Sequence, residues 1–337
     1  MGFFAVLGLI IVLLIVLVAE LVNGWTDAPN AITSVVVTRV LSLRQAIIMA
    51  AVGNVIGAMF FGEKVAQTIG KEIVDASAIN LETVFSAMVA LILWSSFAAT
   101  RGVPTSESHG LVAGLTGGAL YVGGADLLLV GGWIKVGIGL VVPIFLAGVL
   151  AYVLATLVIK TCATRNPARC KRFFSTVQIF TAAGMAWAHG MNDGMKFIGV
   201  FSLAWHLGGM TPEVIIAPWI IVLCAFVMGV GTWFGGATII YKTGCQMTTL
   251  ENWQGCSAEL AGAIAIVLAT MFGIPLSTTH SANMAIMGAG RARGAHALNW
   301  GVVWELVRAW LLTFAVCPVL AFLVAMISDN LLNLLFR

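Results

Sequence analysis

Two short polar stretches interrupt otherwise apolar parts of the sequence, GVPTSESH at 102–109 and GIPLSTTH at 273–280. In both, a proline precedes a group of hydroxyl side chains, and proline suits the first turn of a helix because it lacks a backbone N–H. A helix N-terminus offers free N–H groups and a positive dipole end, which together bind anions. The stretches therefore predict an oxyanion site whose hydroxyls cap the helices or point at the ligand: Thr105, Ser106, Ser108, Ser277, Thr278 and Thr279.

These hydroxyl groups have an alternative, purely structural role, since small and hydroxyl residues are common where membrane helices pack. One such stretch alone would favour packing or the capping of a helix end. The recurrence of a matched stretch in the second half of the chain favours binding.

Two aspartates stand among amides, hydroxyls and glycines, in NGWTDAPNA at 23–31 and HGMNDGMK at 189–196. An acid at bilayer depth is costly and usually marks a functional site. Hard cations take oxygen ligands from carboxylates, amides, hydroxyls and backbone carbonyls. A cation beside the anion would partly neutralise both charges, which is a physical basis for co-transport. The residues that we expect to hold it are Asp27, Asn30, Asn192 and Asp193, with Thr26 as an accessory residue.

Several of these side chains could serve other purposes. Asp27 could cap the helix that begins near Pro29, and Asp193 could pair with Lys196, three residues further on. Lys196 could instead lend its positive charge to the anion. The histidines are either hydrogen-bonded core residues or carriers of a coupling proton: His109, His189 and His280.

The composition gives the class of protein that must position these residues. Of 337 residues, 60% are hydrophobic and 9% are charged, whereas about a quarter are charged in a soluble domain; the mean hydropathy is +1.03. The first apolar run, 3–22, is long enough to span a bilayer, and similar runs recur to the end of the chain. We expect an all-α polytopic membrane protein. The net charge of +3 does not indicate a nucleic-acid partner, and the cysteines show no metal-ligand spacing.

One basic segment divides the chain near its middle. Segment 160–175 carries five lysines and arginines and no acid, so the positive-inside rule predicts that it is a cytoplasmic linker. Arg39 and Arg44 are expected on the same side, which places the N-terminus outside.

The segments on either side of this linker, 1–159 and 176–337, resemble two copies of one repeat. An aspartate, a Leu-Glu pair, a proline and a histidine follow each other in both; 82 residues separate Asp27 from His109 and 87 separate Asp193 from His280. If each copy crosses the membrane an odd number of times, the copies are inverted, as in many secondary transporters. We therefore expect a broken helix and a re-entrant helical hairpin in each repeat, because irregular backbone at membrane depth must line a cavity or be buried in protein.

Taken together, these stretches resemble the inorganic phosphate transporter (PiT) family, which also contains sulfate permeases. The resemblance rests on GWTDAPNAITSVVVTR, GVPTSESHGLVAG, AHGMNDGMKFIGV, MTTLENWQGCSAELA and GIPLSTTHSANMAIMGAG. It implies an inverted-repeat fold with two re-entrant hairpins, symport of inorganic phosphate with Na⁺ or H⁺ across the cell membrane, and a homodimer. By the same resemblance, the hairpin hydroxyls bind phosphate, and Asp27, Asn30, Asn192 and Asp193 bind the coupling cation, with Na⁺ as their metal if the protein is sodium-coupled.

The chain departs from the family pattern at two positions. Thr26 stands where many sodium-coupled members have Asn, which leaves the choice between Na⁺ and H⁺ open. Glu107 lies inside the first hairpin, and an ionised carboxylate 4 Å from a phosphate charge would repel it by roughly 4 kcal/mol at an effective dielectric constant of 20. Glu107 must therefore point away, pair with a cation such as Arg101, or be protonated.

Three other functions are alternatives to phosphate transport. A sulfate permease of the same fold is the nearest alternative, and an ion channel is another. An intramembrane enzyme built from His109, His189, His280 and the two acids is remote, because the sequence has neither HExxH nor GxSxG. We expect no enzyme activity and no cofactor other than the coupling ion.

Overall fold

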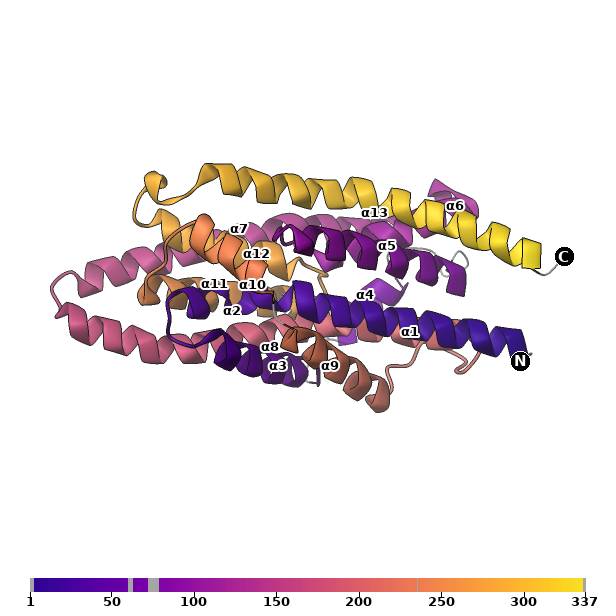
Figure 1. The fold of residues 1–337 in the computed structure, drawn as a ribbon, viewed down its shortest axis with the longest axis horizontal. Coiled ribbons are helices and arrows are strands. Elements are labelled where there is room, and N and C mark those ends of the chain that lie inside the picture. Colours follow the sequence, from indigo (N-terminus) through magenta and orange to yellow (C-terminus); the bar gives the residue numbers. More distant parts are fainter. Residues whose placement is uncertain (1–2, 60–62, 72–78, 235, 336–337) are drawn as a thin grey trace.

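The computed structural model describes residues 3–59, 63–71, 79–234 and 236–335, and the remaining residues of the two expected repeats lie outside the described part. Helices make up nearly all of it (Figure 1). In the first half these are α1 (Phe3–Thr26), α2 (Ala28–Val37), α3 (Leu43–Met59), α4 (Glu63–Lys71), α5 (Leu81–Thr100), α6 (Glu107–Gly123), the 3₁₀ turn η2 (Ala125–Leu127) and α7 (Val130–Cys162).

The second half repeats the end of this order. It contains α8 (Pro167–Leu207), α9 (Pro218–Trp233), α10 (Ala237–Tyr241), the π-helical turn η3 (Lys242–Gln246), α11 (Asn252–Met271), α12 (Thr278–Arg291), the 3₁₀ turn η4 (Ala295–Ala297) and α13 (Trp300–Leu335). In both halves a pair of helices is followed by one 3₁₀ turn and then by a long helix. Within the basic segment 160–175, only 163–166 lie outside α7 and α8.

The helices have the length and the surface of a multi-pass membrane protein, as expected. Five helical segments in the described part are long and apolar enough to cross a membrane: Phe3–Val37, Leu81–Thr100, Val130–Cys162, Asn252–Met271 and Trp300–Asp329. Large apolar side chains face outward, among them Phe145, Phe226 and Leu311. An apolar outer surface fits lipid, since an exposed apolar patch of this extent is rare on soluble proteins.

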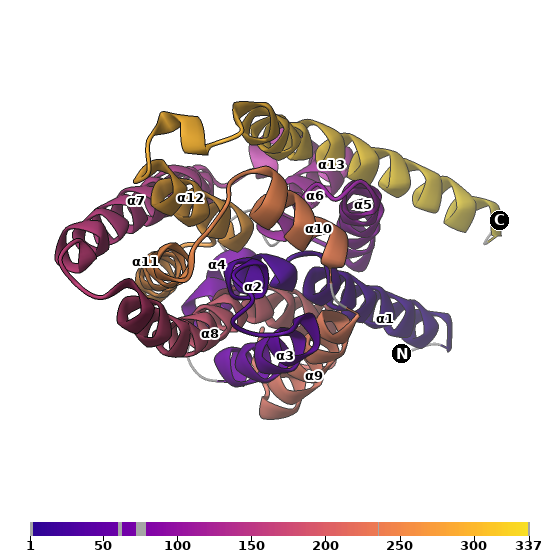
Figure 2. The ribbon, with the colours of Figure 1, turned by 60° about the vertical axis from the view of Figure 1, so that its left-hand side comes forward.

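The predicted broken helix is present in the first half. Helix α1 ends at Thr26 and α2 begins at Ala28, with Pro29 in its first turn and Asp27 between them. Asp27 holds the N-cap position, but its side chain makes no capping hydrogen bond, so its carboxylate is free for other contacts. Figure 2 shows α2 in the middle of the bundle, where it contacts α3, α8, α10, α11 and α12.

In the second half no break coincides with the aspartate; the bend there, of 63°, lies between Pro218–Trp233 and Ala237–Gln246. Helix α8 runs without interruption through Asn192 and Asp193, because this stretch contains glycines but no proline to remove a helical hydrogen bond. A glycine here serves helix packing instead: a Cβ on Gly190 would lie 2.2 Å from the backbone oxygen of Asn54 in α3. Acid and helix break therefore do not coincide at Asp193 as they do at Asp27.

Both polar stretches lie where two helices of a pair are joined. Residues 101–106 connect α5 to α6, and 272–277 connect α11 to α12. Helices α6 and α12 have 17 and 14 residues, which makes them about 26 and 21 Å long, shorter than the roughly 30 Å hydrocarbon core. Figure 1 places α5 and α6 toward the end of the molecule that holds both termini, and α11 and α12 toward the opposite end.

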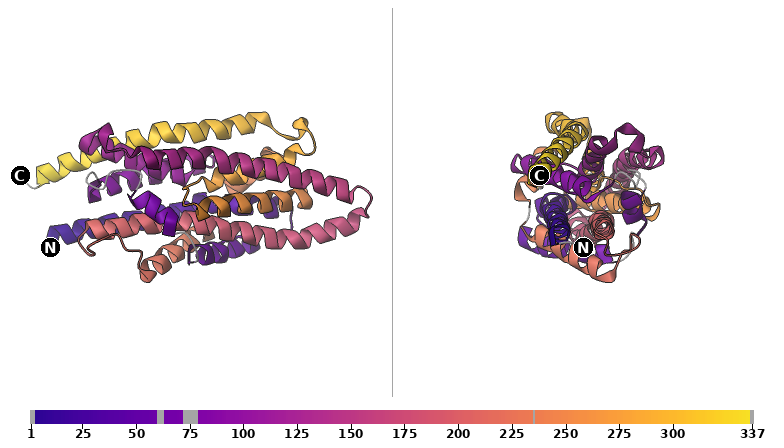
Figure 3. Two further views of the ribbon diagram at one scale, coloured as in Figure 1. Left: turned by 180° about the vertical axis from the view of Figure 1, so that it is seen from behind. Right: turned by 90° about the vertical axis from the view of Figure 1, so that its right-hand side faces the viewer.

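The second helix of each pair packs against a long helix of the other half. A Cβ on Gly117 of α6 would lie 2.1 Å from the backbone oxygen of Pro318 in α13, and one on Gly288 of α12 would lie 2.1 Å from that of Gly148 in α7. These glycines let two backbones meet directly. The left view of Figure 3 shows that α7 and α8 run to the end opposite the termini, where the turn 163–166 joins them.

Candidate functional site

The two aspartates predicted to share a site do lie together. Thr278, at the start of α12, places its Oγ1 atom 3.1 Å from Oδ2 of Asp27 and 2.7 Å from Oδ2 of Asp193. His189, one turn before Asp193 on α8, has its Nε2 atom 3.4 Å from Asp193 and 3.9 Å from Asp27. All four side chains are buried. The break between α1 and α2 and the unbroken α8 thus present their acids to one hairpin.

The tips of the two helical pairs touch each other. The Ser108 hydroxyl donates to the backbone oxygen of Leu276 over 2.7 Å, and Oγ1 of Thr279 lies 3.1 Å from the backbone oxygen of Thr105. Thr279 also donates to the carboxylate of Asp27. The N-termini of α6 and α12 therefore meet beside the two aspartates.

Two of the six predicted hydroxyls close helix ends. Ser106 accepts a hydrogen bond from the backbone N–H of His109 over 3.2 Å, and Ser277 accepts one from His280 over 3.1 Å. These are N-caps of α6 and α12, a role that suits hydroxyl side chains. The prolines, expected in the first turns, lie before the helices instead, at Pro104 and Pro275. Ser106 and Ser277 thus cap helix ends, which is the structural role that the sequence offered as an alternative to anion binding.

Each aspartate has a nitrogen donor three residues further along the chain. Asn30 Nδ2 lies 3.2 Å from Oδ1 of Asp27 and 3.4 Å from Oγ1 of Thr279. Lys196 donates to Asp193 and to Ser108, so the expected Asp193–Lys196 pair is formed. Asn30 thereby links Asp27 to the hydroxyl of Thr279. Lys196 links Asp193 to the hydroxyl of Ser108 in the same way.

Lys196 is enclosed by oxygen atoms. Its ammonium group also donates to the backbone oxygen of Leu276 over 2.9 Å, and its side chain is 1% exposed. An enclosed ammonium needs such partners, because burying an unpaired charge is strongly unfavourable.

Glu107 points into the protein and does not pair with Arg101. Its side chain is buried and accepts a hydrogen bond from the hydroxyl of Thr26. Arg101 is exposed and lies over the ring of Phe97, 4.0 Å from its centroid. Among the described atoms, Oε2 of Glu107 has no hydrogen-bond partner. The expected pair of Glu107 with Arg101 is therefore wrong.

Three predicted residues lie apart from the carboxylates. Asn192 donates to the hydroxyl of Thr270 on α11 over 2.7 Å, because neighbouring residues on a helix face different directions. The ring centroids of His109 and His280 are 4.7 Å apart, and His280 stacks on Trp310. In the described part of the chain, neither ring nitrogen of His109 has a hydrogen-bond partner, so the expectation of a hydrogen-bonded core residue fails for it.

Sequence reasoning missed two further polar groups. Oδ1 of Asn54 in α3 lies 3.0 Å from Nδ1 of His189 and orients that ring on the side away from the two acids. Glu259 of α11 is buried and accepts hydrogen bonds from Ser34, Thr181 and Gln178. Each was visible as a polar residue inside an apolar run, which at membrane depth is itself a signal.

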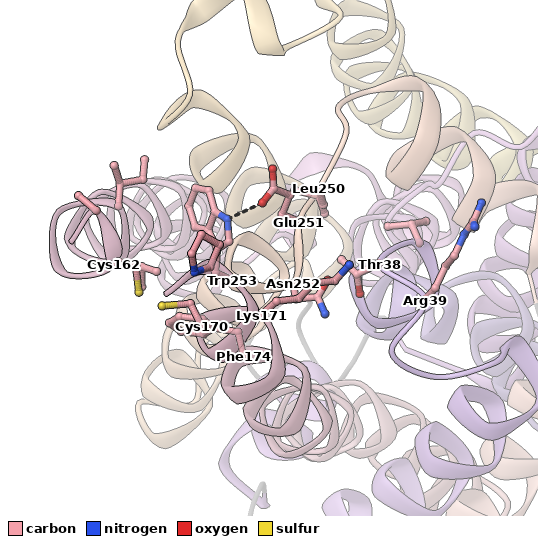
Figure 4. Close-up of a pocket in the computed structure, with 15 residues that line it drawn as sticks. Thr38, Arg39, Cys162, Cys170, Lys171, Phe174, Leu250, Glu251, Asn252 and Trp253 are labelled. Carbon is pink, nitrogen blue, oxygen red and sulfur yellow. Dashed lines mark hydrogen bonds between the residues drawn. The ribbon is translucent and has the colours of Figure 1, made fainter. Parts of the chain in front are cut away.

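The side chains that could hold a metal ion are Asp27, His189 and Asp193, whose ligand atoms lie within 4.8 Å of one another. A cavity of about 580 Å³ lies elsewhere, between the end of α2, the turn from α7 to α8 and the start of α11. Figure 4 shows Arg39 and Lys171 among its lining residues. None of the residues that line this cavity is among the predicted site residues around Asp27 and Asp193.

Comparison with known proteins identifies the family to which this chain belongs. The sequence model of the phosphate transporter family matches residues 23–321. The chain belongs to the phosphate transporter family. Its members named below are called transporters, and the protein is a transporter and not an enzyme, as the sequence predicted.

Relatives in this family resemble the chain over nearly its whole length. A protein of Rhizobium meliloti is 33% identical over 92% of this chain and 93% of its own, and one of Bacillus subtilis is 35% identical over 97% and 99%. Both are called "Probable low-affinity inorganic phosphate transporter". A solved structure titled "The sodium-dependent phosphate transporter" is 22% identical, covers 96% of this chain and 99% of its own, and has a TM-score of 0.85. This likeness shows that the two share a fold.

Proposed function

We propose that this protein is a secondary active transporter that moves inorganic phosphate across the cell membrane together with Na⁺ or H⁺, by alternating access. The observation that carries this proposal is the meeting of two helix N-termini, from α6 and α12, beside two buried aspartates. The names of the relatives support phosphate as the substrate.

The phosphate would bind at the joined tips. The first backbone N–H groups of a helix have no partner within the helix, and at both tips they accompany hydroxyl groups. Because α6 and α12 approach from opposite ends of the molecule (Figure 1), their positive dipole ends would act on one anion. The hydroxyls assigned to it are Thr105, Ser106, Ser108, Ser277, Thr278 and Thr279, with Thr26, Glu107, His109, Lys196 and His280 as accessory residues.

The coupling cation would bind at the acids. Two carboxylates beside a phosphate dianion repel it, by roughly 4 kcal/mol for each pair of charges 4 Å apart at an effective dielectric constant of 20. A cation on Asp27 or Asp193 would offset this repulsion, so phosphate and cation favour each other's binding. Asn30, beside Asp27, would be a further ligand. Asn192, which bonds Thr270 here, would have to turn toward the acids to add its amide oxygen, which is buried and has no hydrogen-bond partner in the described part.

We further propose that 1–159 and 176–337 are inverted repeats, each with a re-entrant hairpin, and that 160–175 is a cytoplasmic linker. The recurring order of helices and the crosswise packing of α6 on α13 and α12 on α7 support the repeats. Arg39 and Lys171 line one cavity with the turn 163–166, and this gathering of positive charge supports a cytoplasmic face. The homodimer implied by the family resemblance stays a prediction.

Uptake of labelled phosphate into proteoliposomes, with imposed Na⁺ or pH gradients, tests the function. We expect accumulation of phosphate that is driven by one of the two gradients and that sulfate does not displace. Displacement by sulfate would instead indicate a sulfate permease, and equilibration without accumulation would indicate a channel; either result contradicts the proposal.

A further inference from the structure

We propose that the ammonium group of Lys196 acts as a covalently attached cation at an oxygen-lined position in the second half of the chain. The matching position in the first half, at Asp27, would bind a free cation. The inference deepens the proposed function, because it names which half of the site exchanges the coupling ion. It rests on three contacts that match between the two halves.

In the second half, Lys196 occupies the kind of place in which a hard cation binds. Its Nζ atom contacts a carboxylate oxygen of Asp193, the hydroxyl of Ser108 and the backbone oxygen of Leu276. Carboxylate, hydroxyl and carbonyl oxygens are the ligands that hard cations prefer. With 1% of its side chain exposed, Lys196 is enclosed at this position.

In the first half, the same kinds of oxygen gather without a positive side chain at the matching place. Asp27 supplies the carboxylate, Thr279 the hydroxyl and Thr105 the backbone carbonyl. Residue 30, which lies three positions after its acid as Lys196 does, is the neutral Asn30. The amide nitrogen of Asn30 faces Asp27 and Thr279, and its oxygen lies 3.4 Å from Nδ2 of Asn283. A half-turn of this amide would present its oxygen as a fourth ligand.

The hairpin contacts correspond as well. Ser108 of the first hairpin lies against the carbonyl of Leu276 in the second, and Thr279 of the second lies against the carbonyl of Thr105 in the first. The matched groups therefore differ in charge at one position only, an amide at Asn30 and an ammonium at Lys196.

This difference has a consequence for coupling. A cation at Asp27 can arrive and leave, whereas the charge of Lys196 is covalently attached and stays with Asp193. His189 faces both acids and does not distinguish the halves. The first half thus exchanges a cation with solution in each transport cycle, whereas in the second half the ammonium group of Lys196 is the cation.

The test is Lys196→Asn, which gives the second half the residue of the first. Binding of radioactive sodium to the purified full-length protein is measured beside wild type and Lys196→Met, which is of similar length but has neither charge nor oxygen. We expect Lys196→Asn to bind an additional Na⁺ per molecule and Lys196→Met to bind none beyond wild type. Equal Na⁺ binding by the two variants would overturn the inference.

Stability gives a second measurement that does not require transport. We expect Na⁺, compared with K⁺, to raise the unfolding temperature of Lys196→Asn and to leave that of Lys196→Met unchanged, because an ion that binds only the folded state stabilises it. If Lys196→Asn unfolds equally in both salts, or folds in neither, the position does not accept Na⁺ and the inference is wrong. Phosphate uptake by wild type is measured separately, so a failure of the proposed function would be recognised on its own.

Discussion

Removing the charge of Asp193, the negative partner of Lys196, should destabilise the fold strongly because both side chains are buried. The substitution Asp193→Asn keeps the size of the side chain but leaves the ammonium with only neutral oxygens. Both members of the pair are 1% exposed, and breaking a buried pair by removing one charge costs about 3–5 kcal/mol, since the other charge is left uncompensated. We expect Asp193→Asn to lower the free energy of unfolding by about that amount.

Two comparisons separate this effect from a general loss of contacts. The double substitution Asp193→Asn with Lys196→Met removes both charges and should recover most of the loss, because no buried charge remains. Glu305→Gln breaks the pair between Lys242 and Glu305, whose side chains are 13% and 49% exposed, and should cost only about 0–1 kcal/mol.

The free energy of unfolding can be measured in mixed micelles by titration with a denaturing detergent, with tryptophan fluorescence as the signal. Equal losses at the buried and the exposed pair would refute the reasoning. So would a double variant that is no more stable than Asp193→Asn alone.

Three other substitutions probe the site and its support. Asp27→Asn should abolish phosphate uptake while the protein still reaches the membrane; undiminished uptake would remove the role assigned to this acid. Thr278→Val removes a hydroxyl between two carboxylates, a contact worth about 1.5–3 kcal/mol, and should reduce kcat/KM for uptake by about 10–100-fold, whereas Thr116→Val, whose hydroxyl donates to the backbone oxygen of Val112 within α6, should change it little. Gly288→Ala should lower the free energy of unfolding by about 1–3 kcal/mol through overpacking, while Gly131→Ala, with open space around it, should not lower it; equal effects would contradict the close approach of α12 to α7.

The sequence predicted the parts of the site that recur. A hydroxyl side chain marks a helix start by local chemistry alone, and the starts of α6 and α12 follow this rule through Ser106 and Ser277. The meeting of Asp27 with Asp193 was predicted because burying two isolated acids in a membrane would be costly.

The rest depends on contacts between distant residues, which local patterns do not contain. Thr26 and Glu107 are 81 positions apart, and no spacing rule joins them. The continuity of α8 through Asp193 could not be predicted from the glycines beside this acid, because the close packing of Gly190 on α3 joins residues far apart in the sequence. Asn54 was missed because a single amide within an apolar run carries no motif.

The direct backbone contacts of Gly117 and Gly288 constrain how the molecule can rearrange. At these points α6 lies against α13, and α12 lies against α7, with no side chain between them that could rotate to absorb a displacement. A rearrangement that preserves both contacts must carry α6 along with α13 and α12 along with α7. Each rigid body in such a motion would therefore contain helices from both halves of the chain, and neither half could move by itself.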